Sequence, residues 1–187
     1  NNNGSNSWGG ISLDEKRGIL YFTTGNPHFY FDGTQRPGKN LNSCSLIAVD
    51  LEKKEILWSF QETSHDIWNS DLPAPPILTS ITKDNEKIDV VVTPTKRSNT
   101  LILDRLTGEP IFNFRLRKAP KSKLAGEKTS NYQPDLELPE PFGRNIFKKE
   151  DLWSYNPVFQ KEINKKYENY NFGFYQPYEL GEKTLQY

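Results

Sequence analysis

Short apolar runs alternate with turn residues over the first 115 positions of the chain. The runs occupy residues 19–23, 46–49, 55–60, 88–92, 100–103 and 111–114. β-Branched and aromatic residues dominate them, and none shows the 3.6-residue period of a helix. Because short strands separated by turn residues are typical of all-β proteins, the pattern predicts an all-β fold with little helix.

Two of the predicted hairpins repeat one another, at residues 48–58 and 102–112. In each, an apolar residue is followed by an aspartate two positions later and by an aromatic residue, Trp58 or Phe112, ten positions later. The aspartate suits a turn and the aromatic ring can pack between neighbouring sheets. Repeated four-stranded units make a β-propeller, although two unrelated hairpins would also fit. We expect two strand–turn–strand units, with Trp58 and Phe112 buried between blades.

The character of the chain changes after Arg115. We interpret residues 1–115 as β-propeller blades, and residues 116–187 as a long irregular proline-rich insertion that leads to the next blade. The insertion has few strand-like runs, while residues 150–167 can hold one or two short helices and residues 173–187 resemble the approach to a further strand.

Composition narrows the function classes. Lysine plus arginine and aspartate plus glutamate number 24 each, so no net charge favours nucleic acid or an anionic membrane. The only cysteine, Cys44, rules out a disulfide framework and a cysteine-based zinc site within the chain. No apolar run is long enough to span a membrane, the first residues do not resemble a signal peptide, and methionine is absent. We expect a piece of a larger protein.

Candidate site residues lie in three polar loops, each after a strand-like run. Asn26 follows the first run, the dense stretch 65–71 follows the run at 55–60, and Lys96 follows the run at 88–92. Three such loops predict one shared rim. Asn26 is either a ligand for a hard cation or a residue that tolerates a left-handed turn. Lys96 either binds an anionic ligand or is an ordinary surface lysine.

The stretch 65–71 carries several candidate groups. Asp66 and Asp71 can each bind a cation, act as a base, or belong to a solvated loop. Trp68 can be a flat floor for an aromatic ligand or part of the core. His65 has no partner at zinc-ligand spacing. Nucleotide-binding and hydrolase motifs are absent from the sequence.

A series of motifs resembles the pyrroloquinoline quinone (PQQ) dependent dehydrogenases, nearest the membrane-type glucose dehydrogenases. They are, in order, WGGIS-x-D at 8–14, YFTTGNP at 21–27, RPG-x-NLNS at 36–43, A-x-D at 48–50, WSFQ at 58–61, HDIW at 65–68, DLPAPP at 71–76, TK at 95–96, DRLTG at 104–108, GEKTS at 126–130, QP at 133–134 and PEPF at 139–142. The resemblance implies an eight-bladed quinoprotein propeller that binds PQQ with Ca²⁺ or another hard cation. This chain would supply only some of its blades.

The resemblance also implies roles for individual residues. Asn26 corresponds to a metal ligand, and Lys96 to a residue that contacts the quinone. Thr24, His65 and Trp68 belong to the same loops and are expected to contact the cofactor. We therefore expect Asn26, Asn69 and Lys96 to point into one cavity.

One position departs from the family pattern. The family usually has His-Asp-x-Trp-Asp, whose last aspartate is the catalytic base beside the metal, but Asn69 stands there in this chain. An amide cannot accept a proton as a carboxylate does. Asp71 corresponds to an additional metal-ligating aspartate of some relatives, so Asp71 or Asp66 would have to act as base. The candidate catalytic residues are thus Asn69, Asp71 and Asp66, and the candidate metal ligands are Asn26, Asn69 and Asp71.

Together these features predict a periplasmic quinoprotein dehydrogenase fragment that oxidises a sugar or alcohol hydroxyl and passes electrons to a quinone-type acceptor. Its partners would be the small-molecule substrate, the acceptor and the remaining propeller blades, with no nucleic acid. Membrane association would need a region outside this chain. The alternative is a non-catalytic propeller, used for binding or assembly, that has lost the catalytic base.

Overall fold

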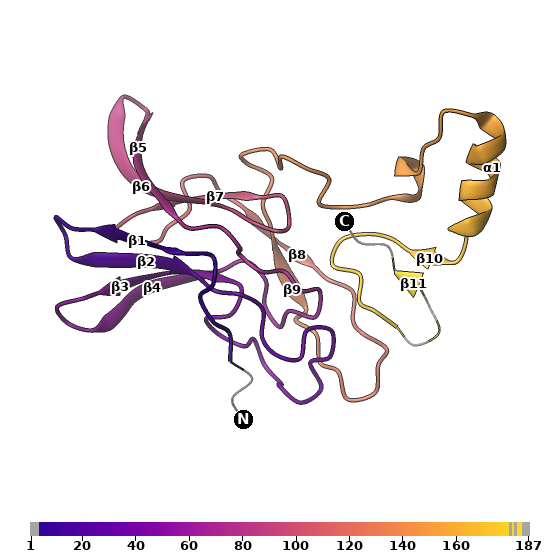
Figure 1. Ribbon diagram of the computed structural model, residues 1–187, viewed down its shortest axis with the longest axis horizontal. Coiled ribbons are helices and arrows are strands. Elements are labelled where there is room, and N and C mark those ends of the chain that lie inside the picture. Colours follow the sequence, from indigo (N-terminus) through magenta and orange to yellow (C-terminus); the bar gives the residue numbers. More distant parts are fainter. Residues whose placement is uncertain (1–3, 180, 182, 185–187) are drawn as a thin grey trace.

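The first four strands form one antiparallel sheet, or blade, in sequential order: β1 (Ile11–Asp14), β2 (Ile19–Thr23), β3 (Ser45–Asp50) and β4 (Glu55–Gln61). The computed structural model describes residues 4–179, 181, 183 and 184 (Figure 1). β2 alternates buried and half-buried residues, as expected for a strand with one face against a core. Ala48 pairs with Trp58 across β3 and β4, which confirms the first predicted strand–turn–strand unit.

The second blade has three strands: β5 (Ile77–Lys83), β6 (Glu86–Pro94) and β7 (Thr100–Asp104). The strand predicted at 111–114 is wrong, because the returning chain makes only an isolated bridge between Pro110 and Leu103. Ile111 N–H adds one hydrogen bond to Ile102 O at 2.9 Å. Proline has no N–H to extend the ladder at that point. Phe112 therefore lies outside a strand, half-buried, with the Lys83 ammonium 5.9 Å from its ring centroid.

Trp58 joins the two blades. Its Nε1 donates to Arg105 O at 3.2 Å, and its half-buried ring packs against the shared core. A Cβ on Gly108 would lie 2.5 Å from Trp58 Cδ2, so the indole occupies the space that only glycine leaves open at that turn. The predicted packing of Trp58 between blades is therefore confirmed.

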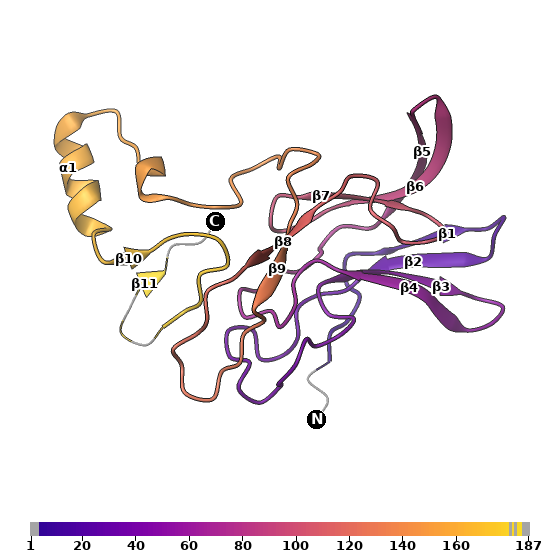
Figure 2. The same cartoon turned by 180° about the vertical axis from the view of Figure 1, so that it is seen from behind.

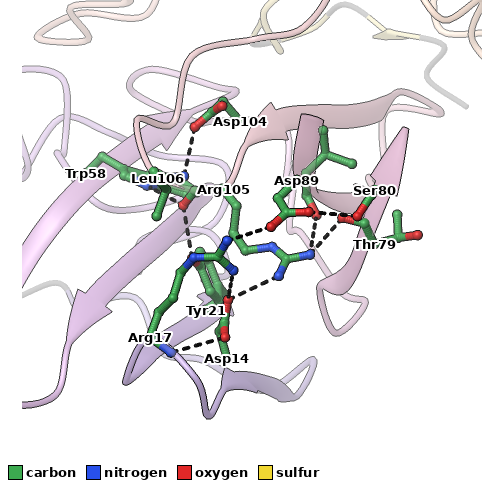
Figure 3. A network of polar contacts seen from close by, with 11 residues as sticks. Asp14, Arg17, Tyr21, Trp58, Thr79, Ser80, Asp89, Asp104, Arg105 and Leu106 are labelled. Atoms are coloured by element: carbon green, nitrogen blue, oxygen red, sulfur yellow. Dashed lines mark hydrogen bonds and ion pairs between the residues drawn. The ribbon is translucent and has the colours of Figure 1, made fainter. Parts of the chain in front are cut away.

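Polar contacts reinforce the same interface (Figure 3). Asp14 of β1 accepts from Arg105 Nη1 of the second blade at 3.1 Å and from Arg17 Nη1 at 2.7 Å. Arg17 also reaches Asp89 of β6 at 2.6 Å, while Tyr21 Oη donates to Arg105 O at 3.0 Å. The two sheets are thus connected by both apolar packing and charged hydrogen bonds.

The rest of the chain is largely irregular, as predicted. It contains the β8 (Arg115–Lys118) and β9 (Tyr132–Asp135) hairpin, the short helix η1 (Lys149–Asp151), helix α1 (Pro157–Lys166), and the parallel pair β10 (Tyr170–Asn171) and β11 (Lys183–Thr184). α1 begins after the N-cap Asn156, whose side chain accepts from Val158 N. The prediction of short helices within residues 150–167 is confirmed by α1.

The C-terminal elements lie to one side of the two blade sheets (Figures 1 and 2). A second apolar cluster packs part of the C-terminal segment against the loop after β4. In it, Trp68 of that loop contacts Ala119, Phe174 and Tyr175. Among the described residues no helix is long and apolar enough to cross a membrane.

Candidate functional site

Loops that follow β2, β4 and β6 meet at the same end of the two sheets. In an antiparallel sheet alternate strands end at the same edge, so the loops after β2 and β4 lie at one edge of the first sheet, and the loop after β6 of the second sheet meets them there. They are Asn26 after β2, Asn69 and Asp71 after β4, and Lys96 after β6. The sequence prediction of one shared rim is therefore reproduced by the fold.

Asp71 is the centre of this cluster. Its Oδ1 accepts from Asn26 N at 2.9 Å, and its Oδ2 lies 3.5 Å from Lys96 Nζ. With the Asn69 amide assigned to satisfy its neighbours, Nδ2 lies 3.0 Å from Asp71 Oδ2 and Oδ1 accepts from Lys96 Nζ at 2.8 Å. Asn69 Nδ2 also lies 3.2 Å from Asn26 Nδ2. Four residues from three loops thus share one set of polar contacts.

The cluster opens into a cavity of about 400 Å³. The cavity is lined by Gly4, Asn6, Trp8, Asn26, His28, Tyr30, Asn69 and Asp71. Asn26 and Asn69 therefore face one cavity as expected. Lys96, which was also expected to point into it, is not among the lining residues and contacts Asn69 from beside the cavity. Asp71 is the only carboxylate among the described residues that line it.

Asp66 lies behind the cavity rather than in its wall. Its carboxylate is fully buried and accepts from Trp68 N and Ser70 N, both at 3.0 Å. Burial raises the pKa of Asp66, although the hydrogen bonds from Trp68 and Ser70 oppose that shift. These hydrogen bonds fix the backbone of the loop. The Asp66 carboxylate therefore stabilises the loop and is not positioned to contact a ligand.

Thr24 and His65 are also internal. Thr24 Oγ1 donates to Asn42 O at 2.7 Å and accepts from Ser45 N at 3.0 Å. The His65 ring is 1% exposed and lies against Glu127. Neither side chain lines the cavity. Their polar contacts hold the neighbouring loops in place.

Trp68 belongs to the core, which was the alternative interpretation of this residue. It is 5% exposed, its Nε1 donates to Gln176 O at 2.9 Å, and its ring meets Tyr175 edge-on at 4.9 Å. The indole that faces the cavity is instead Trp8, which is 57% exposed. Sequence reasoning missed Trp8 because it precedes β1 and lies outside the dense polar stretches.

The donor set at the cavity fits a hard cation. No three His, Cys, Asp or Glu side chains group closely enough to hold a metal ion within the described part of the chain. However, turning the Asn69 amide would place its Oδ1 3.0 Å from Asp71 Oδ2. A cation favours such convergence of oxygens, and amide and carboxylate oxygens are the ligands that Ca²⁺ prefers. Its remaining ligands would come from outside these residues.

A family model described as "Glucose/ethanol/alcohol dehydrogenase, beta-propeller domain", with the name PQQ, matches residues 1–187. The chain therefore belongs to this family of quinoprotein dehydrogenases and forms part of their β-propeller.

Individual relatives agree with this assignment. The glycerol dehydrogenase large subunit of Gluconobacter thailandicus is 28% identical over 192 residues, 97% of this chain and 25% of the relative. Quinoprotein glucose dehydrogenase of Escherichia coli (strain K12) is 31% identical over 138 residues, 73% of this chain and 17% of the relative. The chain thus spans a quarter or less of the length of these relatives.

Among solved structures, quinohemoprotein alcohol dehydrogenase from Comamonas testosteroni matches with a TM-score of 0.55 at 25% identity, covering 71% of this chain and 20% of that one. A europium-containing methanol dehydrogenase matches with a TM-score of 0.55 at 25% identity, covering 69% of this chain and 23% of that one. The predicted propeller fold is confirmed.

Proposed function

We propose that the complete protein is a PQQ-dependent dehydrogenase that oxidises a sugar or alcohol hydroxyl, and that this chain supplies part of its cofactor site. The observation that carries the proposal is the convergence of Asn26, Asn69 and Asp71 at one cavity in a chain of this family, with Lys96 in contact with Asn69 and Asp71. A quinone-type electron acceptor and a periplasmic location complete the proposal. They are supported by the family resemblance of the motifs.

The cavity residues suit the cofactor pair by their chemistry. Asn26 and Asn69 would offer neutral amide oxygens to Ca²⁺ or another hard cation, and Asp71 an anionic one. Lys96 would place its ammonium beside the anionic quinone, and Trp8 would offer an aromatic surface. When bound, PQQ supplies a carbonyl centre that takes up the two electrons of the substrate.

Asp71 is the candidate for accepting the hydroxyl proton. Asn69, at the position of the family's aspartate, has no basic oxygen, and the Asp66 carboxylate is occupied by Trp68 N and Ser70 N. Asp71 is the carboxylate that remains in the cavity wall, 10% exposed. Lys96 Nζ and Asn69 Nδ2 both lie against its Oδ2 and orient the carboxylate.

Asn69 also favours a second candidate function. A propeller that binds the cofactor or a partner without turnover would retain Asn26 and Lys96 and would tolerate the loss of the base at position 69. The two candidates differ in one property, which is turnover by the fully loaded protein.

The test uses the complete protein reconstituted with PQQ and Ca²⁺. We expect stoichiometric PQQ binding and dye-linked oxidation of sugars or alcohols by the unmodified protein. Binding without turnover, together with a rise of about 100-fold or more in Asn69→Asp, the scale of general-base catalysis, would support the non-catalytic propeller. Failure to bind PQQ at all would reject both uses of the cavity.

A further inference from the structure

A buried pair joins the loop that presents Asn69 and Asp71 to the proline-rich segment more than fifty residues away. His65 Nε2 lies 2.5 Å from Glu127 Oε1, and both side chains are 1% exposed. His65 Nδ1 lies 2.7 Å from Gly38 O, so both ring nitrogens have a polar partner within hydrogen-bond distance. Glu127 Oε2 accepts from Gly33 N at 2.6 Å. Both partners are thus fully engaged within the protein.

The segment that carries Glu127, which we call the strap, is the connection between β8 and β9, residues 119–131. The strand that follows the strap, β9, contacts the chain just before the site loop. Gln133, the second residue of β9, accepts from Ser64 N at 2.9 Å and donates to Ser64 O at 2.7 Å. Gln133 is fully buried. Consecutive residues Ser64 and His65 are therefore each fixed by a buried side chain from the region of the strap.

The backbone of the site loop, residues 65–71, needs such support. His65 has a φ of 50° and Asn69 a φ of 61°, both in the left-handed region. This conformation is uncommon for residues other than glycine and is held in place by surrounding contacts. The His65 ring is enclosed by Gly38 O and Glu127, and the backbone N–H of His65 donates to Lys39 O at 2.9 Å. Release of the ring would let the start of the site loop relax and would move Asn69 and Asp71.

Gly33 shows how closely the pair is enclosed. A Cβ on Gly33 would lie 2.3 Å from His65 Nε2 and 2.8 Å from Glu127 Oε1. Gly33 is not among the residues with positive φ, so alanine suits its backbone. Gly33→Ala is therefore a wedge that separates the pair while both side chains remain present.

We propose that Glu127 is a positioning residue of the cofactor site, which acts through His65 to fix the site loop that carries Asn69 and Asp71. The inference rests on the proposed dehydrogenase function and adds to it a role for the proline-rich segment. On this proposal the strap sets the geometry of the cofactor site, although no strap residue lines the cavity.

The experiment compares Glu127→Ala, Glu127→Gln and Gly33→Ala in the complete protein, with Glu140→Ala as a control from the same proline-rich segment, where Glu140 is exposed. In Glu127→Ala and Gly33→Ala we expect kcat per bound PQQ to fall about 10- to 100-fold, as for other residues that orient an active-site group. Glu127→Gln keeps the shape and two hydrogen-bonding atoms, so it should recover most of that loss. Glu140→Ala should behave as the parent.

Hydrogen exchange measured by mass spectrometry supplies a readout that does not depend on turnover. Exchange in peptides covering residues 64–72 should increase in Glu127→Ala and Gly33→Ala, while β2 and β3 stay protected. If the parent shows no PQQ-dependent turnover but this exchange pattern appears, the proposed function fails and the link from strap to loop stands. If melting temperature falls while kcat per bound PQQ and loop exchange are unchanged, the positioning role is overturned. Should Glu127→Ala not accumulate, Gly33→Ala decides alone.

Discussion

The Asn69 amide lies against the Asp71 carboxylate, with Nδ2 3.0 Å from Oδ2. The two side chains share one wall of the cavity, two positions apart in a loop where the family pattern has an aspartate at position 69. The resemblance implies a carboxylate at position 69, where this chain has an amide, and Asp71 places a carboxylate two positions later in the same wall. This relationship makes the site of proton transfer open to direct test.

Asp71→Asn should lower dye-linked turnover of the complete protein by about 10²- to 10⁴-fold, the usual contribution of a general base. PQQ should remain bound, because Asn26, Lys96 and Trp8 are unchanged. Turnover and PQQ content are measured on the same reconstituted samples. Asp84→Asn is the matched control, since Asp84 is exposed at the β5–β6 turn and its φ of 53° suits asparagine.

Moving the carboxylate back by two residues should restore activity. In the double variant Asn69→Asp/Asp71→Asn, the φ of 61° at position 69 accommodates aspartate as well as asparagine. We expect turnover at least about tenfold above that of Asp71→Asn, since a base again faces the cavity. Equal activity of the single and double variants would contradict proton transfer at this wall.

Trp8 and Trp68 should respond differently to substitution. Trp8→Ala removes an exposed aromatic surface of the cavity and should weaken PQQ binding up to about tenfold, the scale of one aromatic contact. Trp68→Phe removes the hydrogen bond to Gln176 O and should cost about 1 kcal/mol of unfolding free energy. Fluorescence titration with PQQ and denaturant unfolding separate the two effects. Loss of PQQ affinity in Trp68→Phe alone would reverse the assignment.

The hydrophobic pattern predicted the strands that carry a continuous apolar run. β2, β3, β6 and β7 carry β-branched and aromatic runs, and each was expected close to its observed bounds. β5 was missed because Thr79, Ser80 and Thr82 interrupt its apolar residues and two prolines precede it. β8 was missed because its sequence, RLRK, has a single apolar residue. Tertiary pairing rather than local pattern forms such strands.

The candidate site divides in the same way. Asn26, Asn69, Asp71 and Lys96 were predicted from two sources, their positions in loops that follow strands and the family resemblance of those loops. The side-chain directions of Asp66, His65 and Trp68 depend on distant partners and could not be derived from spacing. Glu127 reaches His65 across 62 positions, and only a folded structure shows that contact.

The close contact of Trp58 with Gly108 should make the blade interface sensitive to substitution at either residue. Gly108 has a φ of 73°, and its added Cβ would lie 2.5 Å from Trp58 Cδ2. Gly108→Ala should therefore lower the free energy of unfolding by about 1–3 kcal/mol, from backbone strain and overpacking. Trp58→Phe should cost about 1 kcal/mol through the lost hydrogen bond to Arg105 O.

Denaturant unfolding of the complete protein measures both changes. Trp153→Phe is the matched control, because Trp153 is 66% exposed, and its change should stay within about 0.5 kcal/mol. A loss of unfolding free energy in Trp153→Phe equal to that in Trp58→Phe would show that the hydrogen bond from Trp58 to Arg105 O does not stabilise the blade interface.

Asp14 should make the blade interface sensitive to acid. Burial alone would raise the pKa of Asp14, but hydrogen bonds from Arg17 and Arg105 together lower it below its ordinary value of 3.8. The unfolded chain therefore takes up the proton first as pH falls, so the stabilisation is present above pH 3.8 and is lost as pH drops through the folded-state pKa.

Asp14→Asn should cost about 1.5–3 kcal/mol at pH 7, the worth of a charged hydrogen bond. The gap between wild type and variant should narrow below pH 3.8, as followed by denaturant unfolding at several pH values. A gap that stays constant down to pH 3 would show that the Asp14 carboxylate contributes no charge-dependent stability (about 1.4 kcal/mol per unit of pKa shift).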